Sequence, residues 1–111
     1  MEKAQSIRRI SSQEEQLLEI LIDLANIQLD KNWKTHLLVK PMNDGGMQSL
    51  KLYPNGLIEN SIRFGKMASE CAFFDEDNVL VIVSLNIDNH GQLYELDSWK
   101  TDFSSIVNLV L

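Results

Sequence analysis

Carboxylates are the side chains of this sequence with the clearest chemical potential. Within residues 67–111 only Lys100 is basic, and the acidic side chains are Glu70, Asp75, Glu76, Asp77, Asp88, Glu95, Asp97 and Asp102. Such a concentration can bind a divalent cation or a basic protein, can supply paired acids for general acid–base catalysis, or can serve only as a solvated surface. It repels phosphates and anionic lipid, so we expect neither nucleic acid nor membrane as a partner.

The sequence signatures of common enzymes and metal sites are absent. There is no GxSxG nucleophile elbow, no GxxxxGK[ST] phosphate loop and no GxGxxG dinucleotide motif. Cys71, His36 and His90 lack the spacing of a zinc site. The acidic segment 75–78 lacks the glycine and the closing glutamate of a calcium loop. We therefore expect no catalytic residue, no metal and no cofactor.

The longest apolar run, Val79–Ile87, is predicted to be the central strand of a sheet. Its odd-numbered residues are all apolar, and its even-numbered residues are apolar at first and polar from Ser84 onward. A strand that begins apolar on both faces is typical of a position inside a sheet, with other groups packed on each side. The turn 88–91 then leads into a partner strand that ends near Asp97.

Counting residues through the turns predicts the register of these strands. A four-residue loop at 88–91 sets Leu85 opposite Tyr94 and Ser84 opposite Glu95. The same counting through the loop 75–78 places Glu70 opposite Val83, on the core face. Two alternatives remain for Glu70: a β-bulge turns it outward, or it is buried with a partner and matters functionally.

The remaining elements complete an α+β fold. Ser11 and Ser12 each precede a glutamate by three residues, a capping-box pattern that predicts a helix over about 12–29. We expect one N-terminal helix packed on an antiparallel β-meander of about four to six strands, in a single domain spanning 1–111. The predicted flanking strands are 36–40, 47–53 and 67–74. Residues 57–66 are either strand or loop, 1–10 form a loose arm or a short turn, and the tail 106–111 covers the sheet or adds to it.

From its composition we expect the protein to be cytoplasmic. No apolar stretch approaches the roughly 20 residues of a membrane span, and the N-terminus lacks the apolar segment of a signal peptide. A lone cysteine gives no internal disulfide and no sign of an oxidising compartment.

The predicted sheet gathers several of the carboxylates. Glu95 and Asp97 are expected to share a face with Ser84 and Asn86, and Asp88 and Asp102 to flank that end of the sheet. The face away from the helix is expected to carry apolar groups that the tail or a second molecule covers, and these are Phe73, Leu80, Ile82 and Leu93. The residues that we predict to bind a partner are Glu70, Asp88, Glu95, Asp97, Trp99 and Asp102.

Two motifs resemble those of a known family. The segments are DGGMQSL at 44–50, LNID at 85–88 and GQLYELDSWKTDFS at 91–104, of which ELDxWKxDFS is the specific part. Over roughly residues 35–105 the chain resembles a family of small bacterial domains of unknown function. The resemblance implies a single compact domain and no catalytic role.

These observations favour a small, acidic, non-enzymatic protein-interaction domain. The partner is expected to be a basic protein, as for an immunity-type protein that neutralises a cationic toxin, or a second copy bound through the sheet. One alternative is an enzyme that uses Glu70, or the pair Glu95 and Asp97, as its carboxylates. Another is a structural subunit of a larger assembly.

Overall fold

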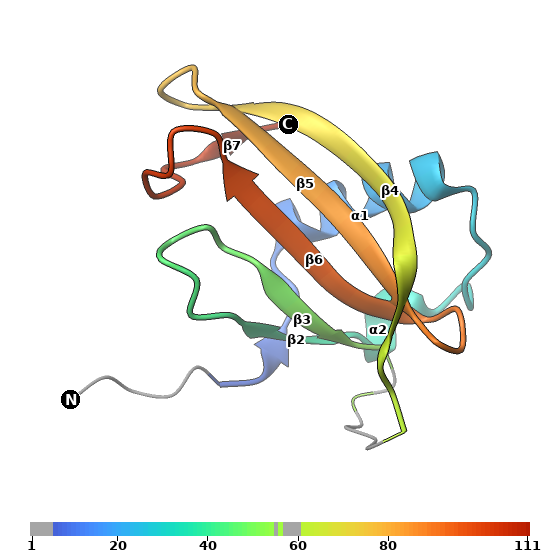
Figure 1. The fold of residues 1–111 in the computed structure, drawn as a ribbon. Helices are drawn as coiled ribbons and strands as arrows, with labels where there is room; N and C mark the ends of the chain where they lie inside the picture. Colours follow the sequence, from blue (N-terminus) through green and yellow to red (C-terminus); the bar gives the residue numbers. More distant parts are fainter. Residues whose placement is uncertain (1–5, 55, 57–60) are drawn as a thin grey trace.

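The computed structural model describes residues 6–54, 56 and 61–111. Its strands form one antiparallel sheet in the order β1-β2-β3-β6-β5-β4-β7. Figure 1 shows that the sheet is curled like half of a barrel and that the main helix, α1, lies across one of its faces. The elements are β1 (Arg8–Arg9), α1 (Ser12–Ala25), α2 (Trp33–His36), β2 (Leu38–Pro41), β3 (Leu50–Tyr53), β4 (Phe64–Asp75), β5 (Leu80–Asp88), β6 (Leu93–Lys100) and β7 (Leu109–Val110).

Helix α1 begins at the predicted capping box and ends earlier than predicted. The backbone N–H of Glu14 donates to Ser11 Oγ at 3.2 Å, and the N–H of Ser11 donates to Glu14 Oε1 at 2.9 Å. The helix stops at Ala25 instead of residue 29 because Asn26 adopts the left-handed conformation, with φ of 53°. No helix in the part of the chain that the structure describes is long and apolar enough to cross a membrane.

The prediction of a central strand is confirmed. β5 lies between β4 and β6, and its buried row faces the core under α1. This row consists of Val81, Val83, Leu85 and Ile87. The first three pack with Leu17, Leu18 and Leu21 of the helix and with apolar residues of the neighbouring strands. Burial of these branched side chains is the main source of stability for the sheet.

The architecture contains more strands than predicted and is not a simple meander. The described residues form seven strands where four to six were expected, and β3 pairs with β6, which places β4 on the far side of β5. The first extra strand is β1, which lies within the predicted arm 1–10; the other is β7, with which the tail extends the sheet instead of covering it. Residues 57–66 were predicted to be either strand or loop. Residues 57–60 of this segment lie outside the described residues, as do residues 1–5 of the predicted arm. Strand β4 begins at Phe64, within the same segment.

The predicted registers are wrong by small slips. Leu85 faces Leu96 instead of Tyr94, a slip of two residues. One residue of the slip comes from the turn, where the N–H of Asp88 bonds to the carbonyl of Gln92 and the loop has three residues instead of four. The other comes from an irregularity of the β5–β6 ladder beside Ile87, which accommodates Tyr94 as an extra residue. In the β4–β5 hairpin, Glu70 faces Ser84 instead of Val83. The turn there contains one residue fewer than predicted, since the N–H of Asp75 bonds to the carbonyl of Val79 at 2.9 Å and leaves only residues 76–78 in the loop. This one-residue slip turns Glu70 to the opposite face, so it is not on the core side.

A buried lysine joins the C-terminal tail to the sheet. The side chain of Lys100 has no exposed surface, and its Nζ donates to Asp75 Oδ2 at 2.7 Å, Asp77 Oδ2 at 2.5 Å and the carbonyl of Ser105 at 3.1 Å. Burial by itself would raise the pKa of Asp75, but Lys100 and the backbone N–H groups that the carboxylate accepts hold that pKa well below its usual range. Two of these N–H groups belong to Val107 and Asn108, so the same carboxylate fixes the tail.

The two sequence motifs meet beside this lysine. The backbone N–H of Ser98 donates to Ser49 Oγ at 3.0 Å, and Lys100 N lies 3.3 Å from the sulfur of Met47. Gly46 has φ of 86°, and a Cβ atom at this position would lie 2.5 Å from Ser105 Oγ. Only glycine therefore fits both the backbone conformation and the contact. The DGGM loop and the segment after β6 form one packed unit.

We predict different costs for neutralising the two carboxylates that hold Lys100. Asp75→Asn leaves a buried ammonium with one charged partner and should lower the free energy of unfolding by about 3 kcal/mol, as for a broken buried ion pair. Asp77→Asn removes a half-exposed partner and should cost about 1 kcal/mol or less. Urea unfolding at neutral pH measures both values. Equal losses for the two variants would show that burial of the pair does not matter.

Candidate functional site

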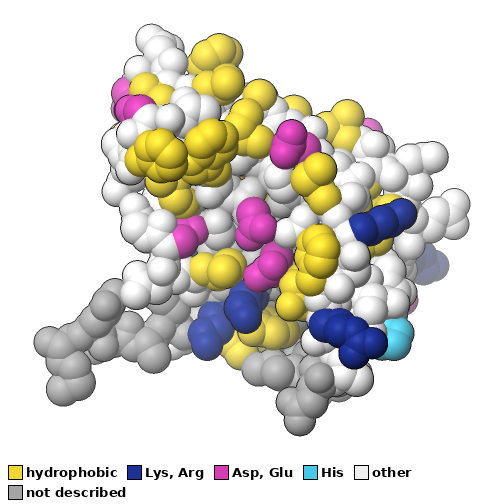
Figure 2. Space-filling view, viewed as in Figure 1, with side chains coloured by type: hydrophobic (Ala, Val, Ile, Leu, Met, Phe, Trp, Pro, Cys, Tyr) yellow, Lys and Arg dark blue, Asp and Glu magenta, His cyan; other side chains and the backbone are white. Residues whose placement is uncertain are grey.

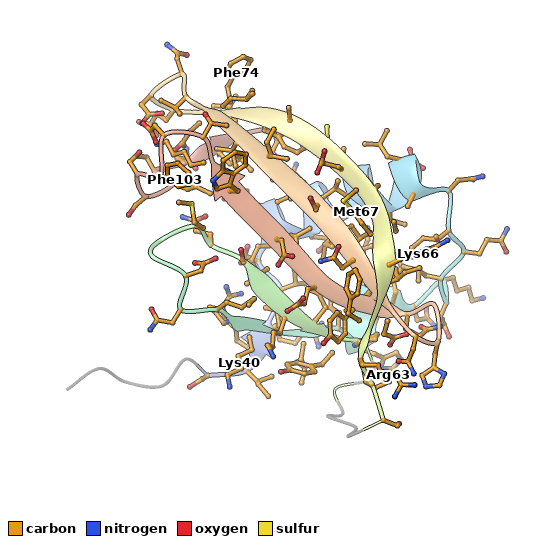
Figure 3. All side chains as sticks on the ribbon, viewed as in Figure 1. Lys40, Arg63, Lys66, Met67, Phe74 and Phe103 are labelled. Atoms are coloured by element: carbon orange, nitrogen blue, oxygen red, sulfur yellow. The ribbon has the colours of Figure 1, made fainter. Side chains whose placement is uncertain are left out.

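The sheet face opposite α1, called the outer face, brings together most of the predicted binding residues. Cross-strand pairing arranges the residues in the central part of this face in three rows. These rows are Lys51–Glu95–Asn86–Met67, then Asp97–Ser84–Glu70, then Trp99–Ile82–Ala72. Figure 2 views this face and shows acidic groups in its middle with apolar groups beside them, and Figure 3 places Met67 and Phe103 on the same side.

The carboxylates in the middle of the outer face are hydrogen-bonded to neutral groups. Asn86 Nδ2 donates to Asp97 Oδ2 at 2.8 Å, and Ser84 Oγ donates to Glu70 Oε2 at 3.2 Å. No ion pair within 4.0 Å among the described residues includes Glu70, Glu95 or Asp97. An ionised carboxylate has about four acceptor positions, so each of these groups has capacity for a further donor.

Glu95 on the outer face has a raised pKa. Partial burial raises its pKa, the neighbouring Asp97 raises it further, and Lys51 on β3 opposes both. Burial and a nearby like charge both disfavour the ionised form. The surroundings on the outer face therefore destabilise the ionised form of Glu95, and a cationic group bound beside it would stabilise that form.

An aromatic pair adjoins this acidic centre. Trp99 is 45% exposed and Phe103 72% exposed, with ring centroids 5.8 Å apart. Phe103 has φ of 64°, which is uncommon for a bulky residue. Large aromatic side chains are enriched among the central residues of protein interfaces.

Two predicted binding residues do not belong to this group. Asp88 is only 4% exposed, and its Oδ1 accepts the backbone N–H groups of His90 at 2.7 Å and Gln92 at 3.0 Å. Asp102 follows β6 and accepts the hydroxyl and the N–H of Ser104, and these bonds lower its pKa. Asp88 and Asp102 therefore lie at opposite ends of the β5–β6 ladder and do not flank the same end.

The apolar groups of the outer face differ in part from the prediction. Leu93 is buried in the core, and Phe73 packs against that core, so the register places neither on the outer face. Leu80 and Ile82 remain there, half-buried. The prediction also missed Lys51, since its place beside Glu95 depends on the pairing of β3 with β6, which no local pattern indicates.

The arrangement offers little support for carboxylate catalysis. Glu70 is exposed on the part of β4 that β7 does not pair with, whereas a catalytic acid needs a partner within a cleft. A shallow pocket among the described residues lies elsewhere and contains none of the outer-face carboxylates. It is lined by Leu29, Asp30, Trp33, His36, Pro54, Gln92 and Leu93.

Comparison with known proteins supports the expected relationship. Over residues 7–110 the chain matches a family described as a domain of unknown function, DUF6984. This match confirms the prediction of a family of unknown function and extends beyond the 35–105 that the motifs indicated. No curated protein and no solved structure matches the chain.

We predict that neutralising either charged neighbour of Glu95 moves its pKa in a defined direction. Asp97→Asn should lower it toward the usual value, and Lys51→Met should raise it further. NMR titration of the Glu95 carboxyl carbon measures both shifts.

The raised pKa of Glu95 also determines how the contribution of this residue to folding stability changes with pH. Because the folded state binds the Glu95 proton more tightly than the unfolded state, this group's contribution is most favourable below the unfolded pKa and is lost as pH rises through the folded pKa. Glu95→Gln should therefore be neutral or slightly stabilising at pH 7. A clear loss of stability would show that ionised Glu95 has a favourable contact in the fold.

Proposed function

Because the chain belongs to DUF6984, a family whose description assigns no activity, we propose a function from the site alone: a non-enzymatic protein-interaction domain whose outer face binds a basic protein. An immunity-type protein that neutralises a cationic partner is the concrete form of this proposal. The cytoplasm is the compartment that suits its lone thiol, Cys71.

One observation carries the proposal. The outer face is open among the described residues and places three carboxylates without ion pairs beside an exposed aromatic pair. The carboxylates supply acceptors for lysine or arginine, and the rings of Trp99 and Phe103 supply apolar area that a partner can bury. Arginine also stacks on aromatic rings, which favours a basic partner over a neutral one.

The charge of the whole chain supports the same partner. The formal net charge is −6, and the C-terminal part that forms the outer face carries most of the acidic excess. A field of this sign accelerates encounter with a basic protein and weakens as salt screens it. Two copies of the chain would repel each other through the same field, so we favour a basic protein over a homodimer through this face.

We predict that reversing charge on the outer face abolishes capture of the partner. The double variant Glu95→Lys, Asp97→Lys should lose, by tenfold or more, a basic protein that the wild-type domain retains from native lysate at low salt. Quantitative mass spectrometry after crosslinking measures the retention. Like charges placed against a basic surface cost several kcal/mol, which exceeds the tenfold change.

The matched control has the same change of net charge at another place. Asp23 on α1 and Asp30 after it are exposed and in no ion pair of the described residues. Asp23→Lys, Asp30→Lys should retain the same partner nearly as well as the wild type. Equal loss in both double variants would mean that net charge alone is recognised, and capture unchanged by the outer-face variant would refute the proposed site.

A further inference from the structure

One long edge of the sheet is unpaired over most of its length. β4 spans 12 residues. On the side away from β5 its partner is β7, which pairs only with Phe74 and Asp75. No other strand among the described residues joins this side of β4. An edge of this kind offers backbone N–H and C=O groups to an incoming strand.

Hydrogen bonds at the end of β4 show which residues have backbone groups directed to the open side. The N–H of Asp75 bonds toward β5, to the carbonyl of Val79, and the N–H of Glu76 bonds the other way, to the carbonyl of Asn108. Because the direction alternates along an antiparallel strand, Ala72 and Glu70 direct their N–H and C=O groups to the open side. No ladder irregularity interrupts β4 between Glu70 and Phe74.

Helix α1 supplies an apolar support beside this edge. Gln13 Nε2 donates to the carbonyl of Leu109 in β7 at 2.9 Å, and Ser69 Oγ donates to the carbonyl of Leu21 at 2.6 Å, so the helix runs along β7 and β4. Ile20 and Leu24 share a helical row with Gln13. Leu24 is 57% exposed, and in Figure 1 the C-terminal end of α1 emerges past β4.

The start of β4 limits how much of the edge is usable. Irregularities lie between Phe64 and Lys66 and between Met67 and Ser69, and such bulges twist an edge away from further pairing. The regular open part is therefore Ser69–Phe73. This length matches the short extended peptides that other domains bind by strand addition.

We propose that the open edge of β4 at Ser69–Phe73 accepts an extended segment of a partner protein as an additional strand, with basic residues opposite Glu70 and apolar residues over Leu24. The apolar–basic alternation follows from the two faces, because successive side chains of the added strand point alternately to the outer face and to α1. The basic character of the segment rests on the proposed function, whereas its pairing with β4 rests on the open backbone groups.

A second copy of the chain fits this edge less well. Pairing Ser69–Phe73 with itself about Cys71 sets Glu70 opposite Ala72 of the other copy and places the two Glu70 side chains on a diagonal of the same face. Like charges at such positions are unfavourable, and the net charge of −6 adds repulsion between copies.

The test uses a synthetic peptide, Lys-Val-Lys-Val-Lys-Val-Lys, and a matched peptide with glutamate in place of lysine. We expect the lysine peptide to slow amide hydrogen exchange of Glu70 and Ala72 by tenfold or more. Ala72→Pro removes one outward N–H without touching the ladder to β5, and should weaken binding by roughly tenfold. Ala72→Val keeps the N–H group and should bind as the wild type does.

A second variant keeps the test independent of proline. Glu70→Lys, on the exposed edge, should lose the lysine peptide and bind the glutamate peptide. No binding of the lysine peptide at millimolar concentration, or equal affinity for Ala72→Pro and Ala72→Val, overturns the strand addition. Protection of Glu70 and Ala72 in a peptide-free dimer also overturns it, since a second copy then fills the edge. The charge-reversal variant Glu95→Lys, Asp97→Lys tests the proposed function independently of this experiment, because neither Glu95 nor Asp97 lies on this edge.

Discussion

The buried ammonium of Lys100 is the constraint on which the C-terminal part of this structure depends. A lysine in the interior is tolerated only when its charge is compensated, and here two carboxylates and a backbone carbonyl do so. Both carboxylates come from the tip of the β4–β5 hairpin, and the carbonyl comes from the tail. The interaction therefore fixes the end of β6, the hairpin tip and the tail relative to one another.

The acidic side chains of the sheet differ in whether the fold itself uses them. Asp75 and Asp88 are buried, and their oxygens bind groups of the fold itself. Glu70, Glu95 and Asp97 occupy the outer face and have no ion pair among the described residues. The carboxylates of the sheet therefore include one group that the fold uses and one that it does not. On the outer face the second group remains available for another molecule, and its cost to stability is visible in the raised pKa of Glu95.

Local patterns predicted the elements well and their pairing less well. The capping box at Ser11 and the alternation in β5 depend on neighbours in sequence, so both were predicted correctly. Registers depend on loop lengths, and a turn after Asp75 that is one residue shorter than predicted was enough to change the face of Glu70. The role of Lys100 and the place of Lys51 depend on contacts between distant segments, and the sequence pattern held no signal for either.

The direction of β7 has a practical consequence. Leu109 faces Asp75 and Val110 faces Phe74, so the backbone leaves β7 heading toward Phe73 and the rest of the free edge. Any residues fused after Leu111 are delivered to that edge at a high effective concentration. An affinity tag at this end would compete there intramolecularly, whereas a tag on the N-terminal side joins the chain ahead of β1, at the opposite margin of the sheet.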